Sequence, residues 1–292
     1  MKRIFFQVVW MSFLFPVAMV HAQNVPAKLR FGIYAPNAPF ASNSERWSYI
    51  KSVASVMQST LNVPCTGTVY ASEGAFTGAL GQLDFAIVDG IYMARAGGKF
   101  RVLATSMYGG GARAPWGLYA RGAANFQALK GKVLVMPSFG GNTAFAEGML
   151  GGEVNVAQYF STVKNVPDIA AAVSAVKTGG GDAVFAPSGM AAGLTLLVSV
   201  GTVPNASFVL VNTKIPVDIV SKVQAAIASV AAPGIGGMGP PAAGGVAFGR
   251  STAKFMSAAP GVMRFQFRGF LKPFAGTYQE SPLFDHFWVM PK

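Results

Sequence analysis

ALGQLDFAIVDG at residues 79–90 and AVKTGGGDAVFAPSG at residues 175–189 follow one plan. Each stretch holds the end of a helix, a glycine turn, an aspartate and a short apolar strand that leads into a loop of small residues. A plan that recurs in this way predicts two similar α/β units in tandem; chance similarity is the alternative, because Gly-x-Asp turns are common. We interpret Asp84 and Asp182 as turn-forming residues rather than as ligand-binding residues.

Strands and helices alternate along the chain before the first of these stretches. A strand at 29–34 leads into a loop at 35–39, and a helix that begins near Ser44 precedes a strand at 63–70. Apolar residues recur at helical spacing in this helix, so we expect the face that carries them to be buried. The residues of that face are Trp47, Ile50, Val53, Ala54, Met57 and Leu61. The alternation predicts parallel sheets covered by helices on both faces.

The rest of the chain continues this alternation. We expect further strands at 84–88, 100–106, 117–120, 133–135 and 183–186, and further helices at 73–82, from about 144, at 168–178 and at 216–230. Residues 233–249 are rich in Gly, Pro and Ala, which favours a loop or poor order. The tail beyond them is rich in aromatic residues, so we expect it to pack on one of the lobes.

The first 22 residues have the layout of a cleavable secretory signal. Lys2 and Arg3 precede an apolar stretch at 4–20, and the sequence VHA at 20–22 lies just before Gln23. The alternative is a permanent anchor, but polar residues and a proline interrupt the apolar stretch, and an anchor needs about 20 mostly apolar residues. No cysteine lies near the cleavage point, which argues against lipid attachment. The sequence therefore predicts a secreted protein whose mature chain begins near Gln23.

The charge and composition exclude several classes of protein. The formal net charge is +12, or +10 once Lys2 and Arg3 are removed, but the basic residues are scattered and form no nucleic-acid-binding motif. Cys65 is the single cysteine, so no internal disulfide can form, and we interpret it as a small buried residue. His286 is the only histidine after the signal, which leaves almost no material for a histidine metal site or a Ser-His-Asp triad. We expect no metal and no cofactor.

Four segments together carry a resemblance to a known family. They are LRFGI at 29–33, GQLDFA at 81–86 with Tyr92 after it, LKGKV at 129–133, and the helix-Gly-Asp-Ala segment that ends at Phe185. Their order and spacing resemble the periplasmic substrate-binding proteins of ABC transporters, in particular the phosphate/phosphite/phosphonate-binding family with the type 2 periplasmic-binding fold. The resemblance covers roughly residues 29–230.

The resemblance implies an α/β protein of two lobes with mostly parallel sheets and a hinge. A signal peptide would occupy 1–22, a discontinuous first lobe 23–115 and 205–292, and the second lobe 116–204. The lobes would close on a small ligand held by loops at the carboxyl ends of strands from both sheets. We expect such a protein to be a periplasmic monomer that is not an enzyme and that passes its ligand to an inner-membrane permease or to another envelope transport protein.

The loops expected at this cleft supply the candidate ligand-binding residues. They are Tyr34, Asn37, Glu73, Asp89, Tyr92, Tyr108, Phe139, Gly140, Gly141, Asn142, Thr143 and Phe185. The family usually has a Ser-Thr-Ser-like run where this chain has 139–143, so backbone donors remain but hydroxyls are lost. Asn165 also stands where a histidine often occurs. Both departures weaken the expected oxyanion pocket. They favour a less charged ligand in a pocket that aromatic side chains line.

Three functions are compatible with the sequence. The first is a receptor that captures a small solute for transport. The second is a periplasmic carrier of an apolar or lipid-like cargo, for example a sterol-like molecule, or a sensor, without an ATP-driven importer. An enzyme is the third, and Glu73 with Asp89 is the carboxylate pair that could supply acid and base.

Overall fold

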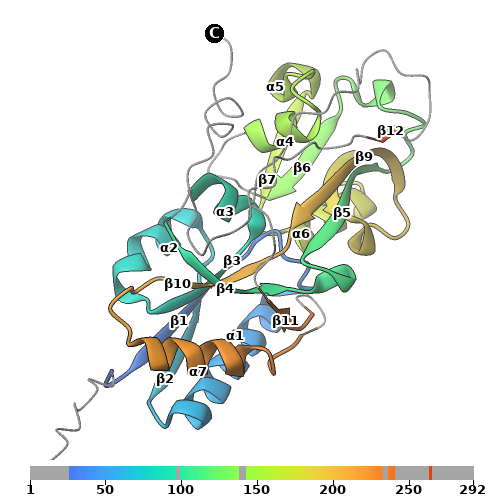
Figure 1. The fold of residues 1–292 in the computed structure, drawn as a ribbon. Helices are drawn as coiled ribbons and strands as arrows, with labels where there is room; N and C mark the ends of the chain where they lie inside the picture. The colour runs from blue at the N-terminus through green and yellow to red at the C-terminus, as the bar shows by residue number, and fades with distance from the viewer. Residues whose placement is uncertain (1–25, 97–98, 138–142, 233–235, 241–262, 265–292) are drawn as a thin grey trace, which may run out of the picture.

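The computed structural model describes residues 26–96, 99–137, 143–232, 236–240 and 263–264. It consists of two six-stranded sheets with helices packed on them (Figure 1), which confirms the predicted two-lobed α/β fold. The predicted signal peptide, most of the Gly/Pro-rich segment and nearly all of the aromatic tail lie outside the described residues. Within the described ranges, no helix is both long enough and apolar enough to cross a membrane.

The first sheet has the strand order β11-β4-β10-β3-β1-β2. Its strands are β1 (Leu29–Tyr34), β2 (Cys65–Val69), β3 (Phe85–Val88), β4 (Arg101–Ser106), β10 (Ser207–Leu210) and β11 (Met238–Gly239). Strands β2, β1 and β3 run parallel, whereas β10 is antiparallel to both of its neighbours, β3 and β4. All four residues of β3 are buried, as an uninterrupted apolar run in the middle of a sheet requires.

Helices cover both faces of the first sheet. They are α1 (Asn43–Leu61), α2 (Glu73–Ala79, continued by a 3₁₀ turn at Leu80–Gln82), α3 (Gly90–Ala96) and α7 (Val217–Ile227). Helices α1 and α7 lie together on one face, and α2 and α3 lie on the other (Figure 1). Because side chains alternate along a strand, Phe85 and Ile87 enter the core beneath α1 and α7, while Ala86 and Val88 enter the core beneath α2 and α3.

The second sheet has the strand order β12-β9-β5-β8-β6-β7. Its strands are β5 (Arg113–Ala120), β6 (Val133–Pro137), β7 (Thr162–Val166), β8 (Ala183–Pro187), β9 (Thr195–Pro204) and β12 (Met263–Arg264). The helices of this lobe are α4 (Ala144–Met149), α5 (Val156–Tyr159) and α6 (Ile169–Thr178), with 3₁₀ turns at Gln127–Leu129 and Ser188–Met190. The pairing of β12 with β9 places 263–264 beside the second sheet, whereas the sequence assigned all of 205–292 to the first lobe.

The two aspartates of the repeated plan occupy equivalent positions. Asp84 precedes β3, and its Oδ2 accepts a hydrogen bond of 2.8 Å from the N–H of Arg30 at the start of β1. Asp182 precedes β8, and its Oδ2 accepts one of 2.8 Å from the N–H of Val133 at the start of β6. The N–H group of each aspartate donates in return to the carbonyl of the same residue. Both aspartates therefore join two parallel strands, as their interpretation as structural residues requires.

Helix α1 departs from its predicted burial at both ends. Ile50, Val53 and Met57 are buried as expected, but Trp47 is 39% exposed, and the Lys51 ammonium lies 5.7 Å from the centre of its ring. Leu61, in the last turn, is only partly buried. Trp47 lies at the edge of the apolar stripe, where the described residues leave more than a third of it exposed.

Two smaller expectations also need correction. The sequence placed a loop of small residues after β3, but α3 begins there at Gly90, because the preceding Asp89 carboxylate accepts the Tyr92 N–H and caps the helix. Cys65 is only partly buried, and its thiol donates to the Val63 carbonyl at 3.2 Å.

Removing either aspartate of the repeated plan will destabilise the lobe that contains it. We expect Asp84→Ala and Asp182→Ala to lower the free energy of unfolding by about 1–3 kcal/mol, because each leaves a backbone N–H group without its partner. Asp84 also accepts from Asn212 Nδ2 at 2.9 Å, so its loss will be the larger. Urea titrations followed by circular dichroism measure the free energy of unfolding of each variant. Unfolding curves that match the parent protein would contradict the assignment.

Candidate ligand-binding site

Within the described residues, two chain segments, 107–112 and 205–206, join the lobes and lie side by side. The Nδ2 atom of Asn205 lies within hydrogen-bonding distance of three carbonyl oxygens of the other segment and its flank, those of Ser106 (3.1 Å), Tyr108 (2.9 Å) and Gly111 (2.7 Å). The N–H of Asn205 donates to the carbonyl of Ala112 at 3.0 Å. Asn205 thus holds the two segments to each other.

A glycine lets the first lobe approach the second closely at this point. A Cβ atom on Gly90, the first residue of α3, would lie 2.1 Å from the carbonyl oxygen of Pro204 at the end of β9. No side chain can be accommodated at that distance. Gly90 therefore sets how closely α3 approaches the strand that leads into the second connection.

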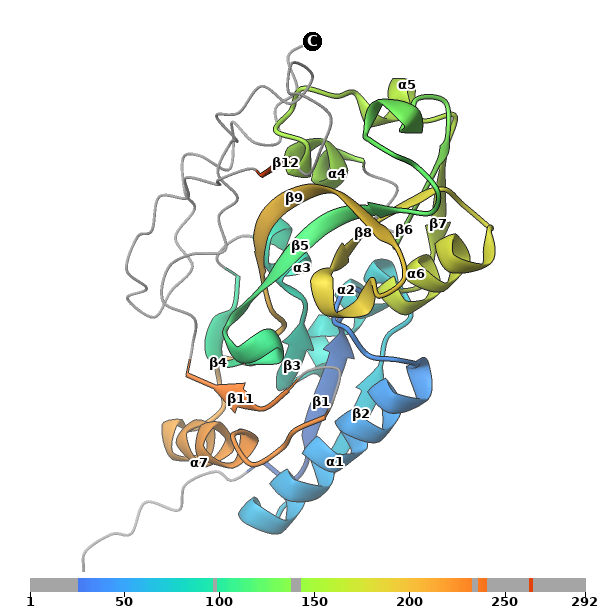
Figure 2. The same ribbon diagram turned by 90° about the vertical axis from the view of Figure 1, so that its right-hand side faces the viewer.

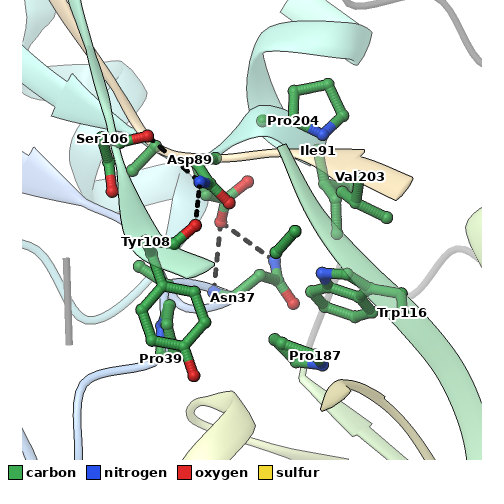
Figure 3. Close-up of a pocket in the computed structure, with 15 residues that line it drawn as sticks. Asn37, Pro39, Asp89, Ile91, Ser106, Tyr108, Trp116, Pro187, Val203 and Pro204 are labelled. Carbon is green, nitrogen blue, oxygen red and sulfur yellow. Dashed lines mark hydrogen bonds between the residues drawn. The ribbon is translucent and has the colours of Figure 1, made fainter. Parts of the chain in front are cut away.

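A small cavity lies between the lobes beside these segments (Figure 3). Its volume is about 20 Å³, and about one water molecule fits in such a space. The first lobe and the connections supply most of the lining, namely Asn37, Ala38, Pro39, Asp89, Gly90, Ile91, Ser106, Tyr108, Asn205 and Ala206. The second lobe supplies Ala114, Trp116, Pro187, Val203 and Pro204.

Asp89 and Asn37 form the polar centre of the lining. Asp89 is 3% exposed, and its Oδ1 accepts from the N–H of Tyr92 at 2.7 Å. Its Oδ2 accepts from Asn37, at 2.9 Å from Nδ2 and 3.3 Å from the backbone N–H. Asn37 is 5% exposed, and its Oδ1 accepts no hydrogen bond within the described part of the chain. Figure 3 shows the bonds from Asn37 to Asp89.

A second contact joins the lobes away from the cavity. Arg46 of α1 and Asp168, which precedes α6, form an ion pair of 3.3 Å with side chains only 6% and 12% exposed. The N–H of Ile169 donates across the same boundary to the carbonyl of Pro36 at 2.9 Å. Asp168 also caps α6 by accepting the N–H of Ala171. The lobes are therefore held together on this side in the conformation described.

Three of the predicted ligand-binding residues meet at the cavity. Asn37, Asp89 and Tyr108 all line it, each from a segment that follows a strand of the first sheet. Burial raises the pKa of the Tyr108 hydroxyl, so this group is uncharged at neutral pH and can donate or accept a hydrogen bond.

Three aromatic candidates lie in the cores of the lobes and do not line this cavity. Tyr34 and Tyr92 pack with Phe76 in the core beneath α2 and α3, with ring centres 5.3–5.6 Å apart. Phe185 is buried in the core of the second lobe. Each belongs to a strand or helix that is covered on the side where its ring points.

The remaining candidates do not reach the cavity or fall outside the description. Glu73 begins α2, is partly exposed and does not line the cavity, so the structure does not bring the suggested acid and base pair together there. Thr143 precedes α4, with its hydroxyl 3.5 Å from the buried Glu147. Residues 139–142 lie outside the described residues. Among the described residues, no three His, Cys, Asp or Glu gather where a metal could bind.

The sequence did not indicate that Trp116, Asn205 and the ion pair of Arg46 with Asp168 lie where the two lobes meet. Trp116 lies inside β5, the strand that follows the connection at 107–112, and its place at the cavity depends on how the two lobes meet. Asn205 and the ion pair contact residues about 100 positions away along the chain. No local spacing signals such contacts.

Comparison with known proteins supports the fold. No protein-family model and no curated protein sequence matches the chain. Among solved structures, it is similar to PhnD1 from Prochlorococcus marinus in complex with methylphosphonate, at 12% identity and TM-score 0.56 over 70% of this chain and 85% of that one. It is also similar to a binding protein component of an ABC phosphonate transporter from Pseudomonas aeruginosa, at 14% identity and TM-score 0.54 over 71% and 76%.

A third similar structure is XAC2383 from Xanthomonas citri bound to ATP, at 11% identity and TM-score 0.51 over 70% of this chain and 83% of that one. The chain has the two-lobed fold of the periplasmic binding proteins. At identities of 11–14%, the similarity shows the fold alone.

Breaking the ion pair between the lobes will let them separate. Asp168→Asn removes the charge opposite Arg46, while asparagine still caps α6. Because an unpaired buried charge is costly, we expect the lobes to open and expose Arg46 to water. Small-angle X-ray scattering of the mature protein will then show a larger radius of gyration than for the parent. Identical scattering would contradict a role for the pair in closure.

Gly90→Ala will disturb the connection between the lobes. The new methyl group would overlap the Pro204 carbonyl, so we expect a loss of about 1–3 kcal/mol in the free energy of unfolding. Gly78→Ala is the control, because it lies within α2 with open space around it and should stabilise the protein by about 0.5–1 kcal/mol. Equal effects of the two substitutions in thermal unfolding would rule out the close contact.

Proposed function

We propose that this protein is a periplasmic solute-binding protein, which captures a small ligand between its lobes for transport. One observation carries the proposal: two adjacent connections, held together by Asn205, join lobes that together line a cavity. This arrangement permits the lobes to close on a ligand by bending at one place. The similarity in fold to phosphonate-binding and other solute-binding proteins agrees with it.

The location and partners follow from the same proposal. The predicted signal at 1–22 would deliver the chain to the periplasm, where the mature protein acts as a monomer and passes its ligand to an inner-membrane permease. A binding role without catalysis suits the cavity, where Asp89 is the one carboxylate among the described lining residues. The small volume favours a small solute over a lipid-like cargo, which would require the lobes to move far apart.

Native mass spectrometry of the mature protein, purified from the periplasm, tests the proposed function. We expect a bound small molecule, or an unfolding temperature that rises when small phosphonates, amino acids or amines are added one at a time. The expected stabilisation is about 2.7 kcal/mol at a solute concentration one hundred times the Kd. A co-purifying lipid with no response to any of these solutes would instead support the carrier of apolar cargo.

A further inference from the structure

The folded chain gathers basic residues at one end of the first lobe. Strands β1, β3 and β4 all begin at this edge of the first sheet, and β10, which is antiparallel to β3 and β4, ends at it. Exposed lysines and arginines lie at or near these strand ends, and we call them the basic end: Lys28, Arg30, Lys99, Arg101 and Lys214. The cavity lies at the opposite edge of the sheet, since Asn37 and Asp89 follow strands.

Hydrogen bonds and strand register bring the basic residues to one surface. Asp84 accepts the N–H of Arg30 at 2.8 Å and Nδ2 of Asn212 at 2.9 Å, and Asn212 Oδ1 accepts the N–H of Lys214 at 3.1 Å. Arg101 lies opposite the last residue of β10. Three strand spacings separate β1 from β4, so the backbones of Arg30 and Arg101 lie roughly 14 Å apart. The basic end is therefore one continuous surface, although its residues are scattered along the sequence.

The carboxylates of the first lobe mostly lie at the other edge of the sheet. Glu45, Glu73 and Asp89 come after β1, β2 and β3, whereas Asp84 and Asp218 are the described carboxylates at the basic end. Both oxygens of Asp84 accept hydrogen bonds from Arg30 and Asn212, and Asp218 is partly buried. None of the five basic residues forms an ion pair within the described part of the chain. This surface therefore carries an excess of positive charge.

An exposed apolar side chain lies beside the basic end. Val217, the first residue of α7, is 73% exposed and follows Lys214 by three residues. Figures 1 and 2 both show the start of α7 beside the start of β1, at the end of the first lobe away from the second lobe. An apolar side chain among exposed cations suits the interface of an anionic bilayer, where the headgroups attract the cations and the apolar group leaves water.

We propose that the basic end of the first lobe binds the surface of an anionic phospholipid membrane, with Val217 at the level of the headgroups. A bilayer surface is recognised through total charge, which suits exposed cations on long, flexible stems. The six residues of β1 span about 17 Å between the basic end and the cavity edge, so contact with a membrane leaves the cavity accessible. This inference goes beyond the proposed solute-binding function and does not depend on it.

Co-sedimentation of the mature protein with lipid vesicles tests this inference. One set of vesicles contains phosphatidylcholine alone, and the other contains equimolar phosphatidylcholine and phosphatidylglycerol. We expect binding to the anionic vesicles only, with an affinity that falls as salt is raised from about 0.01 M to about 0.1 M, because salt screens the attraction. Absence of binding to the anionic vesicles at the lower salt concentration would overturn the inference. Solute binding, measured without vesicles, would be unaffected, so the proposed function would still stand.

Two matched triple variants locate the contact. Removing three cations of the basic end should weaken binding to the anionic vesicles about a hundredfold, since each cation near an anionic membrane contributes roughly fivefold. Removing three exposed lysines of the second lobe, with the same loss of charge, should leave the affinity unchanged. The first variant is Lys28→Gln with Arg101→Gln and Lys214→Gln, and the second is Lys130→Gln with Lys132→Gln and Lys177→Gln.

Both triple variants should fold, because none of the six side chains makes a hydrogen bond within the described residues. Equal losses of affinity in the two variants would show that total charge drives the binding and would refute the assignment to the basic end. Val217→Ser should weaken binding severalfold at every salt concentration, because it removes an apolar contact rather than a charge. An affinity equal to that of the parent protein would refute the placement of Val217 at the headgroups.

Discussion

The whole arrangement depends on the hydrogen bonds that Asn205 makes between the two connections. Its side-chain nitrogen lies 2.7–3.1 Å from three carbonyl oxygens of the other connection and its flank. These bonds keep two segments together although about 100 residues separate them in sequence. Gly90 brings the first lobe against the same place, because its missing side chain leaves room for the Pro204 carbonyl. Figure 2 shows strands β5 and β9 of the second sheet above β1, β3 and β4 of the first. The junction acts together with the ion pair of Arg46 and Asp168, which joins the lobes at another place.

The sequence allowed most of the fold to be predicted, for reasons that are local. The repeated turn of glycine and aspartate is a short-range signal, and Asp84 and Asp182 proved to join equivalent pairs of parallel strands. Continuous apolar runs such as 85–88 identified buried strands. The errors were also local in origin: Trp47 matched the spacing of a buried face but lies at its edge, where it is 39% exposed among the described residues.

The site was predictable only in part, because it combines residues of both lobes. Asn37, Asp89 and Tyr108 could be expected near the cavity because they follow strands, where loops of an α/β sheet gather at one edge; their role as ligand-binding residues stays a prediction. Trp116 and Asn205 were missed, since their roles depend on how two distant segments meet. Tyr34 and Tyr92 lie in the core although they are at or near strand ends. A position after a strand therefore does not ensure that a side chain reaches the cleft, because the side chain can point beneath a helix instead.

We propose that the ligand binds between the lobes, and hydrogen–deuterium exchange with mass spectrometry tests this most directly. The mature protein would be compared with and without the solute that raises its unfolding temperature most. We predict slower exchange in segments of both lobes at once, around 37–39 and 89–91 in the first and around 114–116 in the second. Protection confined to one lobe, or located away from these segments, would contradict ligand binding between the lobes.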